Sequence, residues 1–150
     1  MSEHRVQINW KAGSEEFKTE SYDRTHTLHF EGGQTLNGSA APDFYGRAEY
    51  ANPEEMLAAS LASCHMLTFL AVAAKMRLPV AEYTDSAVAT LEKNAEGRMA
   101  VTKVVLRPKV TFQDNANAPD ASKLEGMHRK AHSACMIANS VKTEVTVEPG

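Results

Sequence analysis

One stretch, NPEEMLAASLASCHMLTFLAVAAK from Asn52 to Lys75, constrains the fold of this chain more than any other feature. No charged residue lies between Glu55 and Lys75. Apolar residues would occupy every face of a helix drawn through it, interrupted only by a few serine, histidine and threonine side chains. A helix that is apolar all round either spans a membrane or lies at the centre of a fold.

The start of this helix is well marked. Asn52 is a good N-cap, Pro53 suits the first helical position, and Glu55 completes a pattern like a capping box. A continuous helix to Lys75 would be roughly 34 Å long. The uncharged run is close to the ~20 residues that a bilayer requires. However, the run is rich in alanine and has no basic flank to set an orientation. We therefore predict a buried core helix.

The rest of the composition is that of an ordinary soluble protein. A chain of 150 residues is expected to form one domain over residues 1–150. The net charge of −3 and the absence of a basic run argue against nucleic-acid binding. The first residues, MSEHRVQINW, lack the apolar core of a signal peptide, so we expect a cytoplasmic protein without membrane contact. In that compartment two cysteines are expected to be reduced, catalytic or metal-bound rather than permanently paired.

Alternating apolar residues and turn signals predict the elements around the helix. Before it, strands are expected at His4–Trp10, Phe17–Ser21, Thr25–Phe30 and Gln34–Leu36, followed by a long loop, Asn37–Ala51. After it, a strand is expected at Tyr83–Glu92, one or two strands at Met99–Phe112, a second helix at Asp120–Ser133, a turn at Cys135–Asn139 and a strand at Val141–Val147. Strands grouped around single helices favour an α+β fold.

The two cysteines are the first candidates for chemistry. Cys64 is either a buried structural thiol or a reactive thiolate that needs a neighbouring cation. His128, His132 and Cys135 have helical spacing and would share one face if the second helix extends that far. Such a face could ligate a metal, with Cys64 or His65 as a further ligand. The common reading is that basic residues near a helix C-terminus complement the helix dipole.

Charged residues near the helix start have ordinary explanations. Glu54 and Glu55 would complement the helix dipole. Arg24 and Arg47 would lie on the surface by default.

The chain contains two motifs: Asn52-Pro53-Glu54 with a cysteine, Cys64, ten residues after the glutamate, and Ala131-His132 with Cys135. Together they resemble the OsmC/Ohr family of thiol peroxidases. The resemblance spans nearly the whole chain. The run SYDRTHTLHFEGG and the Ser-Cys-His-Met run are similar to an OsmC-like branch, in which His65 replaces the phenylalanine of better-known branches.

The resemblance implies an OsmC-like α+β fold, with antiparallel sheets around the long buried helix and a second helix, in an intertwined homodimer. It implies reduction of organic hydroperoxides in oxidative stress defence, without a metal or organic cofactor. The first cysteine becomes a sulfenic acid, the second forms a disulfide with it, and a dithiol reductant such as a lipoyl protein restores both.

Carried over to this sequence, Cys64 is the peroxidatic residue, Cys135 the resolving residue and Glu54 the carboxylate that holds an arginine. Arg24 is the preferred arginine, and Arg47 is the alternative.

Two other hypotheses stay open at this stage. One is a non-catalytic metal- or ligand-binding protein that uses Cys64, Cys135, His132 and His128. The other is a family member without turnover that binds small apolar molecules.

Overall fold

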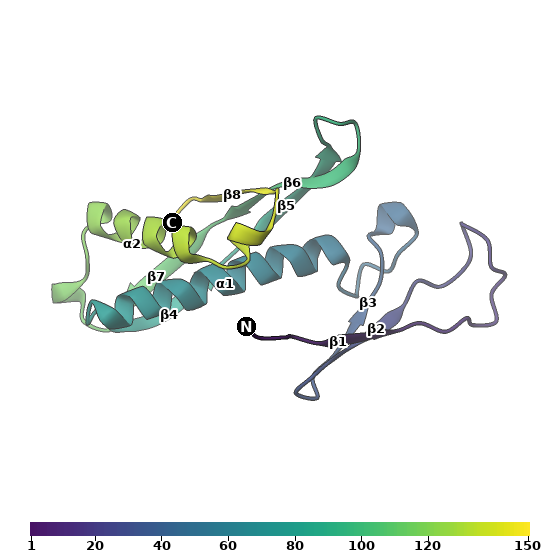
Figure 1. Cartoon of the computed structure of the whole chain (residues 1–150), viewed down its shortest axis with the longest axis horizontal. Coiled ribbons are helices and arrows are strands. Elements are labelled where there is room, and N and C mark those ends of the chain that lie inside the picture. Colours follow the sequence, from purple (N-terminus) through teal and green to yellow (C-terminus); the bar gives the residue numbers. More distant parts are fainter. The chain divides into compact units, whose positions relative to one another are not determined.

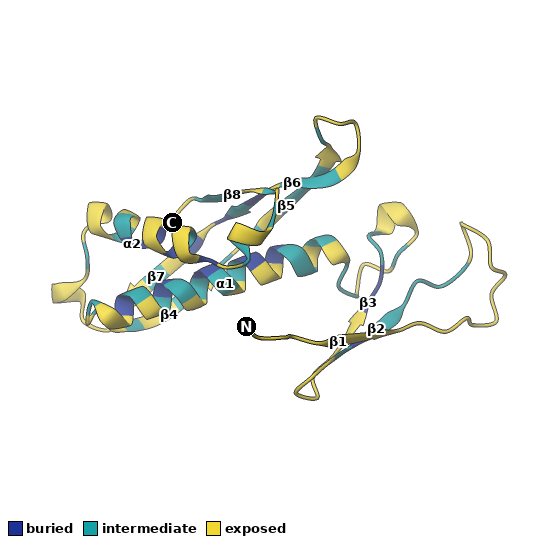
Figure 2. Ribbon diagram, viewed as in Figure 1, coloured by how far each residue is buried: buried dark blue, intermediate teal, exposed yellow.

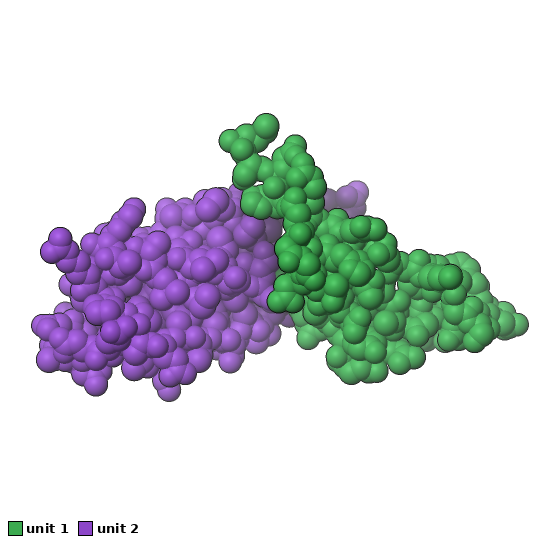
Figure 3. Space-filling view, turned by 90° about the horizontal axis from the view of Figure 1, so that it is seen from below, with its two compact units in different colours: residues 1–56 green, residues 57–150 purple.

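The computed structural model describes all residues from Met1 to Gly150. Its contacts divide the chain into two compact units, Met1–Met56 and Leu57–Gly150 (Figure 3). The boundary falls in the first turns of the long helix α1, Pro53–Lys75. The expectation of one domain over residues 1–150 stays a prediction.

The N-terminal unit contains a three-stranded antiparallel sheet. Its strands are β1 (Val6–Asn9), β2 (His26–Phe30) and β3 (Thr35–Gly38), with β2 in the middle. The turn between β2 and β3 contains Gly33 at φ 98°, a conformation that glycine adopts without strain. These strands confirm three of the predicted segments. A short 3₁₀ helix, η1 (Pro42–Phe44), lies in the long loop before α1.

The strand expected at Phe17–Ser21 is wrong, because the backbone turns there. The N–H groups of Ser21 and Tyr22 both donate to the carbonyl oxygen of Lys18, at 3.0 and 3.1 Å. Apart from Phe17 the segment is polar, so a strand would have no apolar face to bury. Local turn hydrogen bonds satisfy the backbone instead.

The C-terminal unit combines most of α1 with two sheets and a second helix. The elements are β4 (Val80–Asp85), β5 (Val88–Lys93), β6 (Met99–Leu106), β7 (Pro108–Phe112), η2 (Asn115–Asn117), α2 (Ala121–Ala134), η3 (Ala138–Ser140) and β8 (Glu144–Val147). One sheet has the order β4-β7 and the other β5-β6-β8 (Figure 1). The α+β fold is thus confirmed, with one difference. Strand β8 runs parallel to β6, because the chain returns through α2 as a crossover.

The strand expected at Tyr83–Glu92 is divided into β4 and β5. The division arises because β4 pairs with β7 whereas β5 pairs with β6. In the partner strands, Arg107 separates β6 from β7 in the same way. Its N–H donates to Oδ1 of Asp85 at 2.7 Å. The two-strand alternative for Met99–Phe112 is therefore the correct one.

Helix α1 has a defined cap at each end. The Glu55 N–H donates to Oδ1 of Asn52 at 2.8 Å, and the Asn52 N–H donates to Oε1 of Glu55 at 3.0 Å. This reciprocal pair confirms the predicted capping box. At the other end Arg77 has φ 57°, and Leu78 N–H donates to the carbonyl oxygen of Ala73 at 2.9 Å. With a second bond, from the Arg77 N–H to the Ala74 carbonyl oxygen at 3.1 Å, this forms a Schellman cap.

One stripe of α1 is buried, rather than its whole circumference (Figure 2). The stripe consists of Ala58, Leu61, His65, Phe69 and Ala73. Its N-terminal part packs on Val104 and Leu106 of β6, and its C-terminal part on β7 and α2. Other faces stay open, as at Leu67, which is 60% exposed. The predicted core helix is thus buried along one stripe in the single chain.

By length and composition alone α1 could cross a membrane, since the mean hydropathy of its most apolar window is 1.8. Core helices of soluble proteins meet the same criterion, and in this chain the stripe of α1 packs on strands and on α2.

Candidate active site

The two cysteines meet inside the C-terminal unit. Cys64 lies in the middle of α1, and Cys135 is the residue at which α2 ends. The thiol of Cys135 is hydrogen-bonded to the sulfur of Cys64, and both are free thiols. Cys135 is buried, whereas Cys64 is half-buried and so remains open to a small molecule.

The surroundings of Cys64 favour its thiolate. Burial by itself raises the pKa of this thiol. Hydrogen bonds from the Cys135 thiol, from the backbone N–H groups of Ile137 and Met136, and from Thr68 outweigh burial, so the pKa lies below the usual value for cysteine. The Thr68 hydroxyl also donates to the Cys64 carbonyl oxygen at 2.8 Å.

The pKa of Cys135 is shifted in the opposite direction. Its burial and its hydrogen bond to Cys64 raise the pKa of this thiol, although the Ala138 N–H donates to its Sγ atom at 3.4 Å. Cys64 is therefore the more acidic thiol of the pair, and a proton lost from the pair leaves preferentially from Cys64.

The backbone donors come from the segment that follows α2. The Cys135 N–H closes the helix on the His132 carbonyl oxygen, and Asn139 N–H then donates to the Cys135 carbonyl oxygen at 3.0 Å. This turn directs two backbone N–H groups at Cys64. The sequence predicted a turn at Cys135–Asn139 but gave no signal that its backbone would bind a thiolate.

Arg24 and Glu54 lie in the N-terminal unit, where both line a hollow of about 420 Å³. The guanidinium of Arg24 lies over the Tyr22 ring, 3.8 Å from its centroid. It donates to the carbonyl oxygens of Thr19 at 2.6 Å and Tyr22 at 3.0 Å, and it forms no ion pair. A charged group entering the hollow would meet an arginine that no carboxylate has neutralised.

Arg47, the alternative arginine, already forms two ion pairs. Its guanidinium pairs with Asp23 at 3.2 Å and with Glu49 at 3.7 Å. It is absent from the lining of the hollow that holds Arg24 and Glu54.

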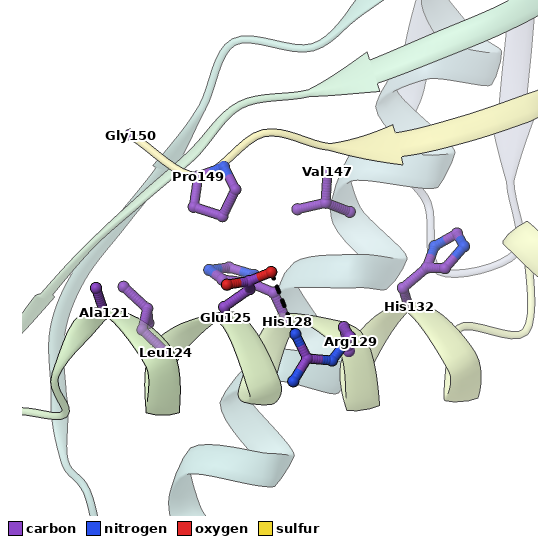
Figure 4. A pocket seen from close by; sticks show the side chains of 9 residues that line it. All are labelled: Ala121, Leu124, Glu125, His128, Arg129, His132, Val147, Pro149 and Gly150. Atoms are coloured by element: carbon purple, nitrogen blue, oxygen red, sulfur yellow. Dashed lines mark ion pairs between the residues drawn. The ribbon is translucent and has the colours of Figure 1, made fainter.

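The histidines form a separate arrangement. Nε2 of His65 and Nδ1 of His128 are 3.0 Å apart and share one proton, and Phe69 stacks on His128 at 4.4 Å between ring centroids. Burial lowers the pKa of each histidine to about 4, so both are neutral near pH 7. Figure 4 shows His128 and His132 on α2 beside a hollow of about 670 Å³ whose lining includes neither cysteine.

The proposed metal ligands do not converge. Helix α2 ends at Ala134, so Cys135 leaves the helical face that carries His128 and His132. No three histidine, cysteine, aspartate or glutamate side chains lie close enough together to hold a metal ion. The arrangement of the Cys/His cluster thus offers no support for the metal-binding alternative.

A family model for OsmC-like proteins matches residues 46–149, which include both cysteines. The chain belongs to the OsmC family. An OsmC-like protein of unknown function from Vibrio cholerae has a solved structure that is 46% identical, covers all of both chains and has a TM-score of 0.95. OhrB of Bacillus subtilis, an organic hydroperoxide resistance protein, shares the fold at 17% identity, with a TM-score of 0.71 over 99% of this chain and 98% of that one.

Curated relatives of this OsmC-family chain include two bacterial proteins. YmaD of Bacillus subtilis, which is uncharacterised, is 29% identical over 79% of each chain. Peroxiredoxin OsmC of Escherichia coli is 27% identical over 65% of this chain and 64% of its own length.

Proposed function

We propose that this protein is a thiol peroxidase that reduces organic hydroperoxides in defence against oxidative stress. The observation that carries the proposal is the thiol pair: a half-buried Cys64 with a lowered pKa, hydrogen-bonded by a buried Cys135. Family membership and the name of the Escherichia coli relative support the same chemistry.

The first step is nucleophilic. The Cys64 thiolate attacks the terminal oxygen of the hydroperoxide, the O–O bond breaks, and the alkoxide leaves as an alcohol after taking a proton. Sulfur is oxidised to the sulfenic acid while the peroxide is reduced by two electrons. The N–H groups of Met136 and Ile137 lower the pKa of the reacting thiol and so favour its anion.

The second step uses the buried thiol. The Cys135 thiol loses its proton, and its thiolate attacks the Cys64 sulfenic sulfur; the S–O bond breaks, hydroxide takes a proton and leaves as water, and a disulfide forms. A dithiol reductant, such as a lipoyl protein, then restores both thiols by exchange and becomes a disulfide itself. No metal or organic cofactor enters these steps.

The remaining site residues are assigned to a homodimer. Arg24, which forms no ion pair, would stabilise the Cys64 thiolate and so lie beside the bound peroxide, and Glu54 would hold Arg24 in place. The uncovered faces of α1 support a second copy of the chain as their partner. Solvent-exposed apolar surface of this kind is expected at an interface.

Steady-state consumption of cumene hydroperoxide and of hydrogen peroxide, with dihydrolipoamide or thioredoxin as reductant, tests the activity. Cys64→Ser should abolish consumption, because it removes the nucleophile. Cys135→Ser should consume one equivalent and then stall or over-oxidise at Cys64. Mass spectrometry of wild-type protein after one equivalent should show an intrachain Cys64–Cys135 disulfide. Full activity in Cys64→Ser would refute the proposal, and first-turnover loss in Cys135→Ser alone would reverse the roles.

A further inference from the structure

Three aromatic rings gather in the N-terminal unit without forming a closed core. Trp10 lies 6.1 Å from Phe17 and 6.3 Å from Tyr22, and Phe17 lies 4.8 Å from Tyr22, between ring centroids. The indole is held in place, since its Nε1–H donates to the Asp23 carbonyl oxygen at 2.8 Å. Even so, Phe17 is 74% and Trp10 45% exposed. Ordered aromatic rings that stay open to solvent are typical of a binding surface.

The rings surround a hollow of about 360 Å³. Its other lining residues are Ile8, Arg24 and His26, so its walls are mainly apolar. A cavity of about 150 Å³ suffices for benzene. The aromatic hollow therefore has room for a substituted benzene, and tilted rings favour the edge-to-face and offset contacts that a flat aromatic group makes.

Arg24 stands at the junction of two hollows. Tyr22, Arg24 and His26 line both the aromatic hollow and the hollow that contains Glu54. Because the Arg24 guanidinium also lies over the Tyr22 ring, it is held beside the aromatic hollow that both residues line. A molecule with its polar end at Arg24 can thus extend its apolar body over Trp10 and Phe17.

We infer that Trp10, Phe17 and Tyr22 determine substrate specificity by binding the body of the hydroperoxide, and that the preferred substrates are hydroperoxides bearing an aromatic ring. This inference rests on the proposed function, because it places the hydroperoxide group at Arg24. Phe17 is a specificity residue and takes no part in the bond changes at sulfur.

Binding can be measured without turnover, because Trp10 is the one tryptophan of the chain. Cumyl alcohol, the product from cumene hydroperoxide, should change the Trp10 fluorescence of the reduced protein, whereas tert-butanol at equal concentration should not. Phe17→Ala should weaken cumyl alcohol binding about tenfold, within the range for apolar pocket contacts. Phe30→Ala removes an exposed phenylalanine ring that lies outside the hollow, and it should leave binding unchanged.

The same variants should affect the kinetics with aromatic and aliphatic hydroperoxides differently. Phe17→Ala should lower kcat/KM for cumene hydroperoxide about tenfold and leave that for tert-butyl hydroperoxide unchanged, because only the aromatic substrate fills the hollow. Circular dichroism checks that each variant is folded.

The outcomes separate the two proposals. Peroxidase activity without a fluorescence response to cumyl alcohol, or equal losses in Phe17→Ala and Phe30→Ala, would overturn the aromatic pocket alone. Specific binding of cumyl alcohol without any peroxide consumption would support the pocket as a binding site and overturn the proposed peroxidase function.

Discussion

At the scale of single residues, the reactivity of Cys64 depends on its hydrogen-bond donors. Burial raises the pKa of this thiol, and the Cys135 thiol is the first of the donors that oppose it. Cys135→Ala should therefore raise the pKa of Cys64, whereas Cys135→Ser keeps a donor and should raise it less. The pH dependence of the rate at which iodoacetamide alkylates Cys64 measures this. Identical profiles for the two variants would mean that the backbone N–H groups alone hold the thiolate.

The His65–His128 pair predicts a loss of stability in mild acid. Both histidines have a pKa of about 4 in the folded protein, below the ordinary value of 6.5, so the unfolded chain binds more protons between these pH values. The contribution of the pair is fully present above pH 6.5 and is lost as pH falls towards 4. At about 1.4 kcal/mol per pKa unit, the loss is on the order of a few kcal/mol.

Urea unfolding between pH 4 and 7 measures this loss. The double substitution His65→Phe with His128→Leu removes both titrating rings and should flatten the pH dependence. His4→Gln changes an exposed N-terminal histidine and serves as the control. An unchanged slope in the double variant would contradict the assignment.

At the scale of elements, the C-terminal cap of α1 holds a strained residue. Arg77 has φ 57°, a left-handed conformation that costs a non-glycine residue about 1–2 kcal/mol. Glycine avoids that cost but gains freedom in the unfolded chain, so Arg77→Gly should stabilise the protein by roughly 0.5–1 kcal/mol. Denaturant unfolding measures the gain. Lys75→Gly, inside the last helical turn, should instead destabilise by about 1 kcal/mol.

Elements with local signals were predictable from the sequence, and those that depend on distant partners were not. Asn52 and Glu55 mark the start of α1, and Asp120 accepts from the Lys123 N–H at the start of α2, so both helices could be placed. The break between β4 and β5 has no such signal, because it follows from pairing with two different strands. The same holds for β8, whose parallel partner is β6.

Some parts of the candidate site could likewise be predicted from the sequence, and others could not. The family motifs identified Cys64, Cys135, Arg24 and Glu54 as candidates. Periodicity could not reveal that the backbone of Met136 and Ile137 would face a sulfur on another helix. Nor could it reveal the aromatic hollow, because Phe17 was assigned to a strand and not to a turn that folds back on Trp10.

At the scale of the whole molecule, the position of Glu54 argues for sites shared between two chains. Glu54 and Cys64 are ten residues apart on α1, which places them about 15 Å apart along its axis. A glutamate side chain cannot span that distance to act beside its own Cys64. In a two-fold dimer with antiparallel central helices, the start of one helix lies beside the middle of the other. We therefore expect Glu54 of one chain to hold Arg24 against Cys64 of its partner.

Complementation between inactive variants tests this arrangement. Cys64→Ser and Glu54→Gln should each lose most of the activity as homodimers. After subunit exchange, each heterodimer should regain one working site, because one chain supplies Cys64 and the other Glu54. Random mixing makes half of the dimers heterodimers, and each of these has one working site of two. The mixture should therefore recover at most about a quarter of wild-type activity. Exchange is followed by native mass spectrometry. If Glu54 only complements the dipole of its own helix, Glu54→Gln should cost about 0.3–1 kcal/mol of stability and little activity. Demonstrated exchange without recovery, or a monomeric protein, would refute the shared site.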